Sequence, residues 1–213
     1  VRSFFSSLIG YIAIGVFLTV NGLFLWVVDS DSSGGYNLLD NCESSLGAFF
    51  DLAPKLFLLL IPAITMRSFS EEINSGTIEF LSTKPLNDLQ IILGKYFACL
   101  FLILFSLLPT LLYYLTVYKL GAPEGNLDSG ATWGSYLGLA MLCAVFVSIG
   151  IFTSSVSANQ IVAFITSVFL SYFSYDAFYR LSKLNIFAGN FETVVQSVGI
   201  NYHYQSISRG VLD

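Results

Sequence analysis

SFSEEINSGTIEFLSTKPL, residues 68–86, is a polar interruption between two long apolar runs. It contains glutamates, a glycine and a proline, in a chain of 213 residues that is 55% hydrophobic and only 11% charged. A soluble domain carries about 25% charged residues, so this chain has too little polar surface to cover a globule in water. The composition therefore predicts an integral membrane protein.

The apolar runs are long enough for helices that cross the membrane, which takes about 17–25 residues each. We expect five spans, at residues 4–28, 46–66, 90–118, 136–153 and 159–179. Proline removes a backbone donor, so Pro62 and Pro109 predict kinks in the second and third spans. The predicted fold is an all-α polytopic transmembrane helical bundle, forming a single transmembrane domain over residues 1–213.

Residues 67–86, which we call the elbow, predict a helix–turn–helix on the membrane surface. The second span continues past Met66 into a short polar helix, on which we expect Glu71 and Glu72 to face water. Gly76 suits the left-handed position that follows a helix C-terminus. From composition alone, an ordinary solvated loop explains the same residues equally well.

Local signals predict where the next helices begin. Thr77 can cap a second short helix, and Glu79 in its first turn is favoured by the helix dipole. The third span begins with a capping box, in which Asn87 is the N-cap and Gln90 stands three residues later. These signals predict an elbow that is joined to both spans with no flexible linker between them.

Two further patterns concern side-chain pairs in the later spans. Asp176 and Arg180 are four residues apart, which predicts a structural ion pair on one helix face, and a substrate contact is the alternative. Gly134 and Gly138 form a GxxxG pair that permits close approach of another helix. Beyond the fifth span, residues 181–213 predict an amphipathic outer segment with an apolar stripe at Phe191, Val194, Val195 and Val198.

No pattern in the sequence predicts bond-making chemistry, a metal site or a bound cofactor on this chain. His203 is the single histidine and lacks the partners of a metal site or a catalytic triad. Residues 125–132 imitate a phosphate-binding loop, but Ala131 stands where the lysine must be. The net charge of −5 argues against nucleic acid as a partner.

The elbow also carries a resemblance. Its pattern EExxxGTxExLxxxPL, from Glu71 to Leu86, followed by Lys95 at the foot of a long span, resembles the coupling region of ABC-2 family permeases. The resemblance implies a multi-pass protein of the bacterial inner membrane, in contact with lipid and with a cytoplasmic elbow that docks on an ABC ATPase subunit. ATP and Mg would then bind to that ATPase, and a second permease chain, identical or a sister subunit, would complete the pathway.

Within this family the chain resembles the gliding-motility-associated permease subunits of Bacteroidetes. The likeness rests on residues 61–86, 108–118, 157–164 and 198–213. It implies an exporter linked to gliding, a short segment before Arg2 and a sixth span after Asp213. A non-transporting membrane anchor of a motility or secretion assembly remains the alternative.

Overall fold

The computed structural model describes residues 8–28, 35–38, 45–79, 87–121, 125–183 and 190–208. Over this part of the chain every regular element is a helix, as the composition predicts. Four helical stretches are long and apolar enough to cross a membrane: Gly47–Asn74, Asp88–Leu120, Ser129–Val156 and Gln160–Ser182. They correspond to the second to fifth predicted spans, so the polytopic helical bundle is confirmed.

The first predicted span, residues 4–28, is described from Leu8 onward as α2 (Leu8–Trp26). Its stretch Gly10–Trp26 is apolar but shorter than the four helices above, so its role as a span stays a prediction. The other elements are α3 (Gly47–Thr65), α4 (Arg67–Asn74), α6 (Asp88–Leu107), α7 (Leu111–Leu120), α8 (Ser129–Val156), α9 (Gln160–Tyr172), the π-helix η1 (Phe173–Ala177), α10 (Phe178–Ser182), α11 (Asn190–Val198) and α12 (Ile200–Ser208).

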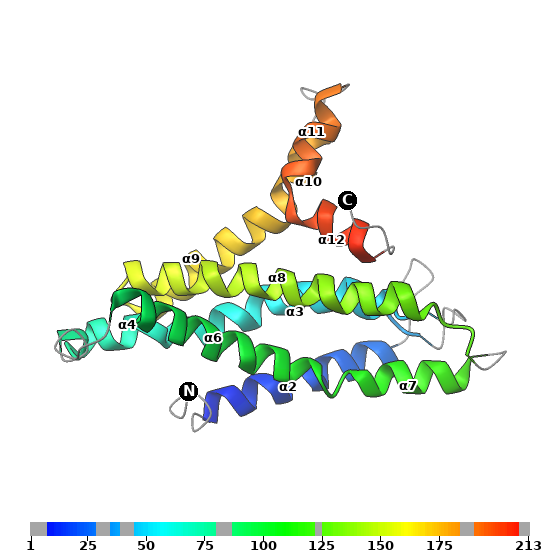
Figure 1. Ribbon diagram of the computed structural model, residues 1–213, viewed down its shortest axis with the longest axis horizontal. Coiled ribbons are helices and arrows are strands. Elements are labelled where there is room, and N and C mark those ends of the chain that lie inside the picture. Colours follow the sequence, from blue (N-terminus) through cyan, green and yellow to red (C-terminus); the bar gives the residue numbers. More distant parts are fainter. Residues whose placement is uncertain are drawn as a thin grey trace.

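The helices form an elongated bundle with an arm on one side (Figure 1). α3, α6, α7 and α8 run along its long axis, and α8 contacts both α3 and α6. α9 leans away from α8 and leads to α10 and α11, which stand out from the bundle before α12 turns back toward α8. α4 lies at one end of the bundle and α7 reaches the other, so the elbow is far from the α7–α8 connection.

The core lies where α3 and α8 pack together. Phe57 and Ile61 of α3, with Leu139 and Phe146 of α8, are fully buried. Phe17 of α2 stacks on Phe57, with ring centroids 4.5 Å apart. α3 and α8 are therefore the central pair, and α2 and α6 pack around them.

The two prolines affect their helices differently. The third span breaks at Pro109, between α6 and α7, where the amides of Leu108 and Leu112 bond carbonyls three positions back, at Phe105 and Pro109, instead of the four positions of an α-helix. The predicted kink at Pro109 is thus confirmed as a helix break. α3 instead continues through Pro62, and the interruption falls at Met66, where α4 follows.

Within the predicted outer segment, the described residues 190–208 form two helices, α11 and α12, that meet at Gly199. Val194 and Val198 of α11 are exposed, as expected of a stripe that faces an interface, whereas the side chain of Phe191 lies outside the described residues. α12 packs on α8 at the GxxxG pair: a Cβ on Gly138 would lie 3.1 Å from the Ile207 side chain. The close helix approach predicted there is confirmed, and its partner is the chain's own tail.

Candidate functional site

The candidate site is the joint between α3 and α4, where the elbow leaves the bundle. Ser68, Phe69 and Ser70 in the first turn of α4 are buried, while Glu71 is exposed to solvent. Because the helix is interrupted at Met66, backbone groups near the start of α4 need partners from outside their own helix. The neighbouring helices α8 and α6 supply them.

Ser154 of α8 bonds the backbone on both sides of the interruption. Its hydroxyl accepts hydrogen bonds from the amides of Phe69 (3.0 Å) and Ser70 (3.1 Å) and donates one to the carbonyl of Met66 (2.9 Å). Ser154 is itself fully buried. A side chain placed against the backbone ladder in this way is one of the recognised causes of a helix kink. It accounts for an interruption at Met66 and not at Pro62.

A glycine one turn away allows α8 to approach this closely. A Cβ on Gly150 would lie 2.1 Å from Oγ1 and 2.8 Å from Cβ of Thr65, the last residue of α3. Residues four apart share one face of a helix, so Gly150 and Ser154 contact the joint together. The contact surface on α8 is therefore one glycine for close approach and one hydroxyl for the backbone bonds.

Lys95 of α6 holds the opposite side of α4. Its ammonium group donates to the carbonyl of Ser68 and to Oε2 of Glu72, and it lies 3.9 Å from the centroid of the Phe69 ring. Only 14% of the Lys95 side chain is exposed, against 32% of Glu72. The ammonium thus makes an ion pair, a backbone bond and a cation–π contact in a largely desolvated place.

This arrangement corrects the expectation that Glu72 faces water. Its neighbour Glu71 is exposed as predicted, but Glu72 turns toward α6 and pairs with Lys95. The two glutamates differ because neighbouring residues on a helix point about 100° apart, so only one of them can face α6. The sequence signal for this pair was a lysine near the start of α6, the helix that follows the acidic elbow.

The turn after α4 matches its predicted geometry. Gly76 has φ +69°, the left-handed position that was expected. The Ser75 hydroxyl donates to the carbonyl of Glu71 at 2.7 Å. The Thr77 hydroxyl lies 2.9 Å from that of Ser75 and 3.4 Å from the carbonyl of Glu72, so its described bonds close the end of α4. Its capping of the next helix stays a prediction, because residues 80–86 lie outside the described residues.

The far side of the elbow is described only in part. Glu79 is exposed and helical, whereas residues 80–86 lie outside the described residues. The capping box at the start of α6 is confirmed, with the Asn87 amide donating to Oε1 of Gln90 at 3.3 Å. Between α4, the turn and α6 lies a cavity of about 280 Å³, lined mainly by Phe69, Ile73, Ile78, Ile91 and Ile92.

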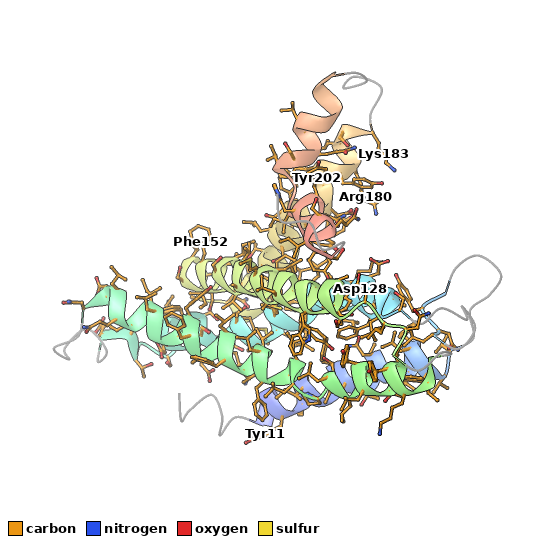
Figure 2. All side chains as sticks on the ribbon, turned by 45° about the vertical axis from the view of Figure 1, so that its right-hand side comes forward. Tyr11, Asp128, Phe152, Arg180, Lys183 and Tyr202 are labelled. Carbon is orange, nitrogen blue, oxygen red and sulfur yellow. The ribbon has the colours of Figure 1, made fainter. Side chains whose placement is uncertain are left out.

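The other predicted pair lies on the arm. Nε of Arg180 donates to Oδ2 of Asp176, which also accepts from the Tyr172 hydroxyl at 3.2 Å. Figure 2 shows Arg180 and Lys183 on this arm, away from the elbow. The structural ion pair is therefore present, but the structure does not bring it to the elbow. The π-helix that carries Asp176 had no clear signal in the sequence.

Residues 125–132, which imitate a phosphate loop, form the turn before α8 and the first residues of that helix. Oδ1 of Asp128 accepts from the amide of Ala131 at 3.1 Å, so a carboxylate caps this helix. A carboxylate at that position repels a phosphate instead of binding it, because both are anions. Figure 2 shows Asp128 at the end of α8 distant from the elbow.

Comparison with known proteins places the chain by family. A family model described as "ABC-2 family transporter protein" matches residues 48–202, which include α3, the described part of the elbow and most of the arm. No curated protein and no solved structure matches the chain.

Proposed function

Because the chain belongs to the ABC-2 family of transporter proteins and is thus a membrane permease of an ABC transporter, we propose that its elbow is the docking site for a separate ATPase subunit. The observation that supports this most is the way α4 is held. It projects at one end of the bundle, yet α3, α8 and α9 contact it and Lys95 of α6 bonds it. When a helix that packs against several neighbours is displaced, those neighbours move with it, whereas a loosely attached loop only changes its own conformation.

The exposed groups of the elbow indicate what the ATPase must offer. Glu71 and Glu79 present carboxylates to solvent, and Glu72 is already neutralised by Lys95. A basic patch on the ATPase would complement the free carboxylates and speed its association. The apolar cavity beside α4 is large enough for one apolar side chain of the same partner.

The mechanism follows from these contacts. ATP and Mg bind to the ATPase, and its closure displaces the elbow. The displacement enters α3 through the chain itself and α6 through Lys95. Such coupling requires that the elbow bind one nucleotide state of the ATPase more tightly than the other, since a ligand with equal affinity for both states shifts nothing.

The direction of transport, the membrane and the cellular role are assigned from the resemblance to gliding-motility-associated permease subunits. It favours an exporter of the bacterial inner membrane linked to gliding motility, with the elbow in the cytoplasm and a second permease chain beside this one. Deletion of the gene in its native host is expected to abolish surface spreading. Normal spreading in a strain without a sister permease would remove the gliding assignment and leave a transporter of other cargo.

Charge reversal at Glu71 tests the docking role. We expect Glu71→Lys to weaken association of the ATPase with the full-length permease about tenfold, measured by co-purification and titration in nanodiscs, because a repelled charge costs about 1.4 kcal/mol. Asp51→Lys is the matched control, since Asp51 is also exposed but lies near the start of α3, away from the elbow. Equal affinities for Glu71→Lys and the parent would contradict docking at the elbow and favour a non-transporting anchor.

A further inference from the structure

Ser154 links two parts of the molecule that the chain does not connect directly. α4 follows α3 and precedes α6, so the chain itself attaches the elbow to those two helices. α8 lies 84 to 88 residues away in sequence from the groups that Ser154 bonds. Any movement of the elbow reaches α8 only through packing and through such bonds.

We infer that Ser154 is a positioning residue that ties the elbow to α8, so that displacement of α4 moves the fourth span directly. The inference rests on the proposed function, in which an ATPase displaces the elbow. It adds a third route for the motion, into the helix at the centre of the core.

A hydroxyl is suited to this position because it is both donor and acceptor. Its one O–H donates to Met66 while its lone pairs accept from Phe69 and Ser70. The site is fully buried, so these backbone groups cannot easily replace the hydroxyl with water. An alanine would keep the close packing at Gly150 but would leave three backbone groups without this partner.

α8 is suited to carry the motion onward. It is one uninterrupted helix of 28 residues, about 42 Å long at 1.5 Å per residue. Near its other end Gly138 contacts Ile207, and the Ser135 hydroxyl donates to the carbonyl of Ser208 at 3.2 Å. A shift of α8 at the elbow therefore reaches α12 of the outer segment without passing through a break like that at Pro109.

The test compares variants that separate the hydroxyl from the volume of the side chain. Ser154→Thr and Ser154→Val have the same shape, but only threonine keeps the hydroxyl. Ser148→Ala is the control, because Ser148 is exposed on the same helix and its hydroxyl bonds the carbonyl of Val145 at 2.7 Å. Each variant is made in the full-length permease, bound to its ATPase in nanodiscs.

Two measurements are made on these complexes. The first is amide hydrogen exchange of peptides covering residues 66–72, which we expect to be about tenfold faster in Ser154→Val than in Ser154→Thr. The second is the distance between spin labels at Asn74 and Val156, both exposed, with and without trapped ATP. We expect one narrow distance in both states for the parent, Ser148→Ala and Ser154→Thr, and a nucleotide-dependent change for Ser154→Val.

The outcomes separate this inference from the proposed function. If Ser154→Val matches Ser154→Thr in exchange and in the label distance, while the parent still stimulates the ATPase, the link through Ser154 is wrong. If the parent neither binds nor stimulates the ATPase, the proposed function fails instead. Faster exchange in Ser154→Val without any nucleotide-dependent change in the distance would also overturn the inference, because Ser154 would then only stabilise the joint.

Discussion

The two ion pairs among the described residues differ in what they hold together. Lys95 and Glu72 lie on different helices, 23 residues apart in sequence, with 14% and 32% of their side chains exposed. Arg180 and Asp176 lie four residues apart on one continuous helical stretch, with 70% and 17% of their side chains exposed, so that the cation is in water and only the carboxylate is buried. The first pair fixes the position of the elbow, whereas the second only supports its own helix. Location decides what the loss of a salt bridge costs, because water screens an exposed charge, whereas removing one partner of a buried pair leaves an uncompensated buried charge.

Replacing Lys95 should have the largest effect on the stability of the permease. We expect Lys95→Met to lower the free energy of unfolding by about 2–3 kcal/mol, toward the lower end for a broken buried pair since Glu72 can still reach water. SDS titration of the purified permease measures this loss. Adding Glu72→Gln should restore part of it. If the two changes are simply additive, the pair does not hold the elbow.

The next largest effect is expected at Gly150. A methyl group there meets Thr65 at 2.1 Å, so Gly150→Ala should cost about 1–3 kcal/mol by forcing α8 away from the joint. The contact of Gly138 is looser, at 3.1 Å from a side chain, and Gly138→Ala should cost less in the same titration. The reverse order would mean that α8 is anchored at its end near α12 and not at the elbow.

A smaller effect is expected at Gly76. Its φ of +69° is unfavourable for a side chain, although space is open around it, so Gly76→Ala should cost about 1 kcal/mol from the backbone alone. Gly94→Ala is the control, because Gly94 lies in α6, has no atom within 4 Å of an added Cβ and needs no positive φ. A stabilising effect of Gly76→Ala would contradict the left-handed turn.

The smallest effect is expected on the arm. Arg180→Ala should leave the unfolding midpoint unchanged within experimental error, because the guanidinium is exposed and its partner keeps the Tyr172 hydroxyl. ATPase binding should also be unchanged. A loss at Arg180 as large as that at Lys95 would remove the distinction between the two pairs.

Local sequence signals predicted local structure well. The break at Pro109, the left-handed Gly76, the capping box at Asn87 and the pair of Asp176 with Arg180 each depend on residues within four positions of one another. Composition was enough for the all-α bundle, because lipid admits few other folds. These features follow from backbone geometry that any helix shares.

The contacts that form the candidate site could not be predicted in the same way. Lys95 with Glu72, Ser154 with α4, and Tyr204 with the carbonyl of Phe50 join residues 23 to 154 positions apart. Their pairing depends on how the helices pack, which no short pattern encodes. Sequence analysis therefore identified the elbow as a candidate site but placed Glu72 on the wrong face of α4.

The most direct test of the account is whether the elbow touches an ATPase in living cells. A photo-crosslinking amino acid is placed at Ser75, exposed in the turn after α4, or at Ser129, exposed at the start of α8 at the opposite end. We predict a light-dependent adduct of the permease with the ATPase from residue 75 and none from residue 129. An ATPase adduct from residue 129, or none from residue 75 in an assembled complex, would contradict it.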